Sequence, residues 1–286
     1  MAKLSVHHLA LAGPLDAALP VEPAPALEVG QSLPLARGPN LYLAGLPGSA
    51  RAPRPVNAPG IAHVCVQALD GAATRAALQA GGAAFLSPPV ALGTGYLYAY
   101  GHDSAGRLFE LETAPFLPAS PRAWFGHVAF VSHDGERLAA FYGALLDAPV
   151  APGVRFRGRR FDQVAGLDRL DLEGWWVRAD GFTLEVWHYH APSAPVADSP
   201  AWYPHLGLET DALDAALDRL ESLGGARGPV LTGADGRSAQ AQDPDGNRLL
   251  LIELAAGAQD RGVAALGHRD ALRRVAAAQA AQAAQS

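Results

Sequence analysis

The sequence is poor in three features that would narrow the class of a protein at once: cysteine, an excess of basic residues, and long apolar runs. Its 286 residues include a single cysteine, Cys65, which excludes an internal disulfide and is typical of a reducing cytoplasm. The net charge of −6 at pH 7 offers no basic surface to nucleic acid. No apolar run is long enough to span a membrane, and the N-terminus has no signal-peptide pattern. We therefore expect a cytoplasmic globular protein without a nucleic-acid or membrane partner.

A histidine followed by an apolar, a small and an apolar residue occurs four times. The four histidines are His8, His63, His127 and His205, so the intervals are 55, 64 and 78 residues. Repetition at this spacing indicates one small structural unit used four times. Because each unit has its histidine at the same place, the units are expected to share a chemical task, and metal binding is the natural candidate.

Each unit follows the order strand, helix and three strands, and the fourth unit is the clearest example. Residues 203–210 predict a strand, and a helix with apolar residues on one face starts at Asp211 and stops at Gly224. The last strand, 248–254, follows the turn 243–247. The second and third units have the same plan, with helices predicted over 71–80 and 135–146. The first unit is degenerate, because a proline-rich stretch at 20–25 cuts its helix short.

The repeated βαβββ plan, the helical segment Phe141–Leu146 and the Asp-Pro-Asp-Gly-Asn turn at 243–247 resemble the vicinal oxygen chelate superfamily. This superfamily includes glyoxalase I, methylmalonyl-CoA epimerase, fosfomycin and bleomycin resistance proteins, and extradiol dioxygenases. The resemblance covers about residues 3–255. It implies that paired modules curl into half-open barrels, each able to hold a divalent metal on its inner wall.

The resemblance thus implies an α+β fold of four βαβββ modules paired into two half-open barrels. We expect residues 1–115 to form an N-terminal pair whose first module is degenerate. Residues 122–256 are expected to form a C-terminal pair that carries the active site. Residues 257–286, rich in alanine, glutamine and arginine, are expected to form a helical tail.

Family members take metal ligands from the first and the last strand of each module. The four histidines match the first-strand position, and the last-strand ligand lies four residues after the turn glycine. This count gives Glu110 and Glu185 in the second and third modules, but Tyr42 and Leu250 in the first and fourth. Glu112 shares the face of Glu110 and is an alternative ligand.

Two candidate metal sites follow from these positions. The preferred site in the C-terminal pair consists of His127, Glu185 and His205, and the weaker site in the N-terminal pair consists of His8, His63 and Glu110. Each set has two imidazoles and one carboxylate, which suits Fe(II) and leaves coordination positions open. Glu253 lies at an odd offset from Leu250, so it should face away and not bind metal.

The aromatic residues predict a substrate cavity in the C-terminal half. Trp187 and Tyr189 follow Glu185 at even offsets and should share its inward face. The aromatic residues proposed to bind the substrate are Trp187, Trp175, Phe156 and Trp202. An aromatic lining of this kind suits an aromatic substrate. His188, His190 and Tyr189 are candidates for acid–base catalysis.

These features favour a metal-dependent enzyme, in the first place an Fe(II) dioxygenase that acts on an aromatic or phenolic compound and uses dioxygen. Mn, Zn and Ni are alternative metals. The sequence also fits a glyoxalase- or epimerase-like lyase or isomerase, in which the metal stabilises an enediolate and a carboxylate moves the proton. A third alternative is a metal-free protein that binds a small molecule such as an antibiotic. Assembly into a homo-oligomer is left open.

Overall fold

The computed structural model describes residues 2–15, 19–48, 52–114, 122–179, 181–195 and 202–267. No helix in these ranges is long and apolar enough to cross a membrane. The first module contains β1 (Leu4–Ala12), β2 (Glu22–Pro23), β3 (Leu27–Glu28), β4 (Ser32–Leu33), β5 (Leu35–Arg37) and β6 (Tyr42–Leu46). The second contains β7 (Gly60–Ala68), α1 (Gly71–Ala80), β8 (Ala84–Phe85), β9 (Val90–Ala91), β10 (Leu97–His102) and β11 (Leu108–Thr113).

The remaining modules lie in the second half of the chain. The third contains β12 (Ala123–Val131), α2 (Gly135–Leu146), β13 (Val154–Arg157), α3 (Arg159–Ala165), β14 (Asp171–Ala179) and β15 (Phe182–Ala191). The fourth contains β16 (Leu206–Thr210), α4 (Leu213–Ser222), β17 (Ala226–Gly233), β18 (Gly236–Gln242) and β19 (Arg248–Leu254). The 3₁₀ helices η1 (Ala256–Arg261) and η2 (Val263–Ala265) follow. The α+β class with repeated modules is therefore confirmed.

The helices α1 and α2 begin where the sequence provides an aspartate cap. The Asp70 side chain accepts a hydrogen bond from the backbone N–H of Ala73 at the start of α1, and Asp134 does the same for Arg137 at the start of α2. Both helices have the predicted bounds. In the first module, for which the sequence predicted a shortened helix, the described residues contain none. Of the tail predicted to be helical, residues 257–267 lie in or beside η1 and η2, and the rest lies outside the described residues.

The modules pair differently from our prediction. Among the described residues, one sheet has nine strands and joins the second and third modules through antiparallel pairing of β7 with β12. The other sheet has eight strands and joins the first and fourth modules through antiparallel pairing of β1 with β16. The division into an N-terminal pair (1–115) and a C-terminal pair (122–256) is therefore wrong. Since all four first strands share one residue pattern, the pattern alone does not identify the partner of each.

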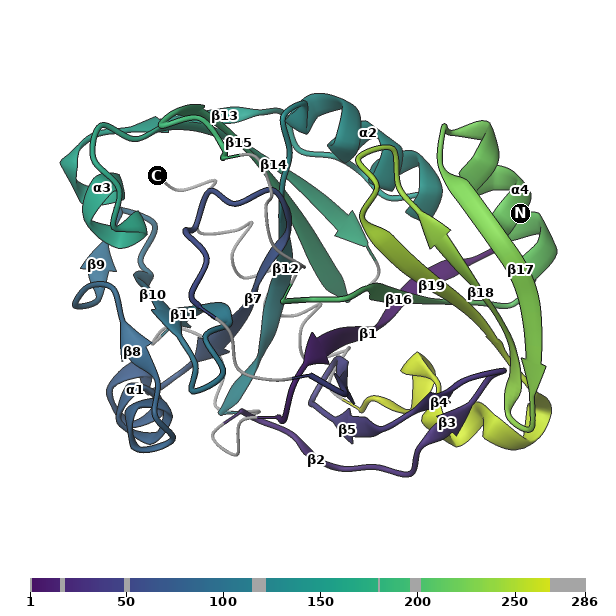
Figure 1. Ribbon diagram of the computed structural model, residues 1–286. Coiled ribbons are helices and arrows are strands. Elements are labelled where there is room, and N and C mark those ends of the chain that lie inside the picture. Colours follow the sequence, from purple (N-terminus) through teal and green to yellow (C-terminus); the bar gives the residue numbers. More distant parts are fainter. Residues whose placement is uncertain are drawn as a thin grey trace.

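A common apolar core lies between the two sheets and the helices α1, α2 and α4 (Figure 1). It takes one face of each first strand, for example Val64, Val128 and Leu208, while the opposite face of each strand belongs to the concave side of its sheet. The motif turn at 243–247 closes on itself, because the Asp243 side chain accepts hydrogen bonds from the backbone N–H groups of Asp245 and Asn247. The Tyr142 hydroxyl of α2 also donates to Asp243 at 2.8 Å. This turn therefore joins the third and fourth modules.

Candidate metal centre and adjoining cavity

Two histidines meet at the centre of the nine-stranded sheet. His63 on β7 and His127 on β12 both point to the concave side, because their sequence neighbours Val64 and Val128 occupy the core. The antiparallel pairing of β7 and β12 brings the two Nε2 atoms within 3.3 Å of each other. Both side chains are buried.

Two glutamates approach the histidines from the flanking strands. β11 runs parallel to β7 with Glu110 beside Cys65, and β15 runs parallel to β12 with Glu185 beside Ala129. In each pair of strands, the residue beside the glutamate is two positions after the histidine. The glutamate and the histidine therefore lie on the same concave face of the sheet. The equivalence of the two registers reflects the repeat of the modules.

The four side chains converge on one point. Glu110 Oε2 lies 3.0 Å from His127 Nε2 and 3.4 Å from His63 Nε2. Glu185 Oε2 lies 3.2 Å from His127 Nε2. One donor atom from each of the four residues lies within 4.8 Å of the other three. Two imidazole nitrogens and two carboxylate oxygens form a donor set that suits Zn, Ni, Mn or Fe(II).

The charges of this cluster also favour a cation at its centre. Burial alone raises the pKa of Glu110, but hydrogen bonds and charges of His127 and His63 lower it to about 2. Burial lowers the pKa of His127, but the carboxylates of Glu185 and Glu110 outweigh this effect and raise it to about 9. In the metal-free protein, a proton on His127 thus provides the positive charge between the two carboxylates. A divalent ion would replace that proton.

A neighbouring indole orients the second carboxylate. Trp176 on β14 lies opposite Glu185 in the antiparallel pair β14–β15, and its Nε1 donates to Glu185 Oε1 at 2.7 Å. Oxygen Oε1 is therefore engaged, and Oε2 is the atom turned towards His127. Outer contacts of this kind set the orientation of metal ligands.

A cavity of about 190 Å³ adjoins the cluster and includes Glu110, Glu112 and Glu185 in its wall. Its aromatic wall residues include Tyr98, Tyr100, Phe156, Trp176, Trp187 and Tyr189. The short helix α3, an insertion in the third module, covers it with Phe161, Val164 and Ala165. The cavity thus connects a set of metal-type donors with an apolar, aromatic space, which is the usual composition of a ligand site.

The structure places three of the aromatic candidates in the cavity and two elsewhere. Trp187, Tyr189 and Phe156 line it, as the strand alternation predicted for Trp187 and Tyr189. Trp175 points to the other face of β14, where its ring covers Gly135 of α2. Trp202 is buried in the common core. Trp175 and Trp202 therefore do not reach the cavity.

The two histidines proposed for acid–base catalysis are also remote from the cluster. His188 and His190 alternate with Trp187 and Tyr189, so they lie on the opposite face of β15. Their rings contact each other, with centroids 4.4 Å apart, and His190 pairs with Glu173 at 3.3 Å. Strand parity holds up to the end of β15 and keeps both rings out of the cavity.

His205, predicted to join His127 and Glu185, instead contacts His8. The Nε2 atoms of His8 and His205 lie 2.9 Å apart in the eight-stranded sheet, in the position that His63 and His127 occupy in the other. The predicted triads His127–Glu185–His205 and His8–His63–Glu110 are therefore not formed, because the structure pairs the modules differently. It combines His63 and Glu110 of one proposed set with His127 and Glu185 of the other.

Among the described residues, no carboxylate forms an ion pair with His8 or His205 of the eight-stranded sheet, and neither belongs to a metal-type group. By strand register, the positions of Glu110 and Glu185 are taken by Ala44, beside Ala10, and Leu250, beside Gly207. Ala44, and not the predicted Tyr42, is thus the equivalent residue. Both are buried in an apolar cluster together with β3, β4 and the 3₁₀ helices. Burial lowers the pKa of His205 to about 4, so the pair stays neutral.

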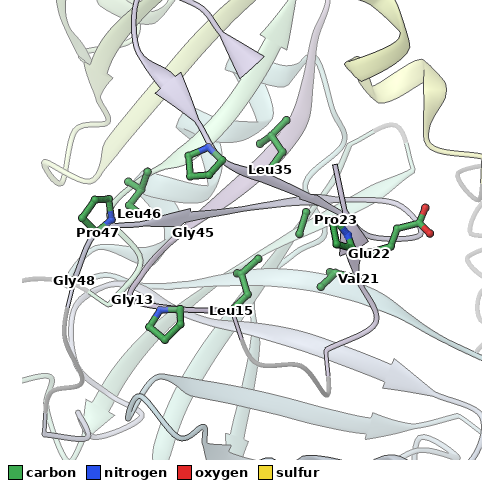
Figure 2. A pocket seen from close by; sticks show the side chains of 13 residues that line it. Gly13, Leu15, Val21, Glu22, Pro23, Leu35, Gly45, Leu46, Pro47 and Gly48 are labelled. Carbon is green, nitrogen blue, oxygen red and sulfur yellow. The ribbon is translucent and has the colours of Figure 1, made fainter. Parts of the chain in front are cut away.

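A larger hollow of about 670 Å³ lies on the first module (Figure 2). Its described lining consists mainly of glycine, proline and aliphatic residues, such as Gly13, Leu15 and Pro47, and Glu22 is its one charged side chain. It has no convergent set of polar groups. The smaller cavity beside the four-residue cluster is therefore the better candidate for chemistry.

Comparison with known proteins supports the assignment of the fold. Residues 124–251 match the family model of the Glyoxalase/Bleomycin resistance protein/Dioxygenase superfamily. The structure is similar to glyoxalase I from Zea mays, with a TM-score of 0.63 and 17% sequence identity over 88% of this chain and 93% of that chain. It is also similar to a provisionally assigned dioxygenase from Bacillus subtilis subsp. subtilis strain 168, with a TM-score of 0.58 and 12% identity over 92% of this chain and 89% of that chain. No curated protein sequence matches the chain significantly.

Proposed function

We propose that this chain is a metal-dependent enzyme with its active centre at His63, Glu110, His127 and Glu185. The match of residues 124–251 to the family model of the Glyoxalase/Bleomycin resistance protein/Dioxygenase superfamily supports this proposal. We infer that it moves a proton on a carbon next to a carbonyl, as an isomerase or lyase does. The substrate is a small molecule with two adjacent oxygens. The convergence of four buried donors at the wall of a cavity is the observation that carries this proposal.

The number of protein donors favours this reaction over oxygen activation. If all four donors bound a six-coordinate ion, two positions would be left, enough for two adjacent substrate oxygens but not for dioxygen as well. When bound, a divalent metal supplies Lewis acidity, which polarises the carbonyl and acidifies the neighbouring C–H bond.

The chain's own residues supply the rest of the reaction. Glu110 and Glu185 both line the cavity, and a carboxylate in that position can take a proton from the substrate carbon. In Glu185, Oε1 is engaged by Trp176 and Oε2 is the proposed metal donor. Glu110 makes both of its histidine contacts through Oε2, so Glu110 Oε1 is the oxygen proposed to hold the proton. The aromatic wall around these groups excludes water and orients the substrate.

Each half-barrel is completed within one chain. β7 and β12 provide both histidines of the site, and β11 and β15 provide both carboxylates. The site therefore needs no second copy of the protein to supply a ligand, whatever the oligomeric state.

An Fe(II) dioxygenase is a second candidate, favoured by two observations. His63, Glu110 and His127 alone form a set of two imidazoles and one carboxylate, with Glu110 Oε2 near both histidines. Glu185 is held by Trp176 and would then act as a neighbouring acid or base. The aromatic cavity wall suits the ring of a phenolic substrate.

Elemental analysis of protein purified without chelator, followed by two assays, tests these proposals. We expect about one ion per chain. We also expect catalysed deuterium exchange at the CH₂ group of 2-hydroxyacetophenone in D₂O, without oxygen uptake when catechol is added. Glu185→Gln should lose the exchange, while Glu253→Gln, remote from the cluster, should keep it. Oxygen uptake with catechol would instead select the dioxygenase, and protein without metal and without either activity would indicate a binding protein.

A further inference from the structure

A third carboxylate lines the cavity beside the proposed metal ligands. Glu112 follows Glu110 by two residues on β11 and faces the same side, with 8% of its surface exposed. Its carboxylate lies near Glu110, His127 and Cys65, but it is not one of the four residues that converge between the histidines. In the described part of the chain, no lysine or arginine forms an ion pair with it.

A chain of hydrogen bonds fixes the position of Glu112. Gln67 on β7 donates from Nε2 to Glu112 Oε2, and Gln67 Oε1 accepts from Trp124 Nε1 at 2.7 Å. Gly126 leaves the space that the Gln67 side chain occupies, since a Cβ atom there would lie 2.7 Å from it. All three interacting side chains are buried. One oxygen of Glu112 is thus held by the protein, and the carboxylate remains part of the cavity wall.

The polar part of the cavity wall has one sign of charge. Glu110, Glu112 and Glu185 are its acidic residues, and none of the described residues that line it is lysine, arginine or histidine. Burial and the charge of Glu110 raise the pKa of Glu112 to about 8, and an ammonium group at hydrogen-bond distance would favour its carboxylate form. The nearby arginines have other partners: Arg155 and Arg157 both bond to Asp171. A substrate with a negative group would therefore meet no counter-charge, and a positive group would meet Glu112.

The size of the cavity limits the substrate to about one ring. A cavity of about 150 Å³ is known to hold benzene, and this one measures about 190 Å³. The rings of Trp176, Trp187 and Phe156 pack edge to face with one another on one side, with centroids 5.6 to 6.2 Å apart. Tyr98 and Tyr100 lie on the β10 side. Aromatic faces of this kind also attract organic cations.

We propose that the cavity selects a single-ring aromatic compound that carries a protonated amino group, and that Glu112 binds this group. The proposal rests on the proposed function in one respect, because the opposite end of the substrate presents its two oxygens to the metal centre. It gives Glu112 the role of a specificity-determining residue, separate from the four donors.

Three catechols that differ only in the charge of their side chain provide the test. Dopamine is cationic, 4-methylcatechol is neutral, and 3,4-dihydroxyphenylacetate is anionic at pH 7. Their Kd values are measured by calorimetry under argon on the metal-loaded protein. We expect dopamine to bind about tenfold to a hundredfold more tightly than 4-methylcatechol, as for a hydrogen bond to a charged group, and the anion to bind most weakly. Glu112→Gln should remove the preference for dopamine over 4-methylcatechol, and Glu253→Gln should keep it.

The wild-type ranking decides the proposal even if Glu112→Gln fails to fold. Equal binding of the three catechols, tighter binding of the anion, or an unchanged preference in Glu112→Gln would overturn it. Failure of the proposed function is recognised separately, by absence of metal. In that case 2-phenylethylamine and benzyl alcohol, which have no adjacent oxygens, are compared on the metal-free protein. A preference for the amine that is lost in Glu112→Gln supports the role of Glu112, and no preference refutes it.

Discussion

Replacement of Trp176 by phenylalanine should weaken metal binding without removing any metal ligand. The indole Nε1 donates to Glu185 Oε1 at 2.7 Å, and Glu185 is buried. A hydrogen bond to a charged group contributes about 1.5–3 kcal/mol, so its loss should reduce the affinity for Zn²⁺ about 10- to 150-fold. This range agrees with the roughly 10- to 100-fold effects found when outer contacts of metal ligands are removed.

Competition with a chromogenic chelator at fixed pH measures the affinity, and Trp175→Phe is the matched control. Trp175 is the preceding residue on β14, but its ring faces Gly135 of α2. The control removes the same indole nitrogen from the opposite face of the strand, so it should change the Zn²⁺ affinity little, whatever it does to stability. Wild-type affinity in Trp176→Phe, or a larger loss in Trp175→Phe, would refute the assignment of Glu185 as a ligand oriented by Trp176.

Three further outcomes are expected. His63→Ala should lose the bound metal and His205→Ala should retain it in elemental analysis, since only His63 belongs to the four-donor cluster. In the metal-free protein, the pKa of His127 is raised from 6.5 to about 9, so its stabilising contribution is complete below pH 6.5 and is lost as the pH rises through 9; urea midpoints should fall over that interval. Glu253→Gln should keep the metal content but lower the free energy of unfolding by about 1 kcal/mol, because Glu253 accepts from the backbone N–H of Leu213 at the start of α4.

The local features of the site were predictable, but their combination was not. The repeat identified the histidines, and the distance from the turn glycine identified Glu110 and Glu185 as donors. The partner of each module depends on contacts between strands far apart in sequence, such as Ala129 beside His63. All four first strands offer the same apolar edge for such pairing. Sequence periodicity therefore predicts which residues face inward, but not which of the two sheets each strand joins.

The cavity wall also combines features that the sequence predicted with one that it did not. Parity from Glu185 correctly predicted that Trp187 and Tyr189 face inward, because β15 is a regular strand. The same parity places His188 and His190, two of the acid–base candidates, on the opposite face of the strand. The repeat gave no signal for the coverage of the cavity by α3, since among the described residues this inserted helix occurs in the third module alone, between Gly158 and Gly166.

The second histidine pair, His8 and His205, indicates that a metal centre requires polar surroundings as well as donor atoms. The variant Leu250→Glu tests this reasoning. The change would place a carboxylate beside His8 and His205, at the position equivalent to Glu185. Leu250 is 1% exposed and packs in an apolar cluster that includes Leu27 and Leu33. A carboxylate there is buried without the indole donor that Glu185 has, so we expect a loss of about 3 kcal/mol or more in the free energy of unfolding and no second ion. If the variant instead gained a second ion per chain at unchanged stability, the missing carboxylate alone, and not the apolar filling, would explain why this half-barrel lacks a metal-type site.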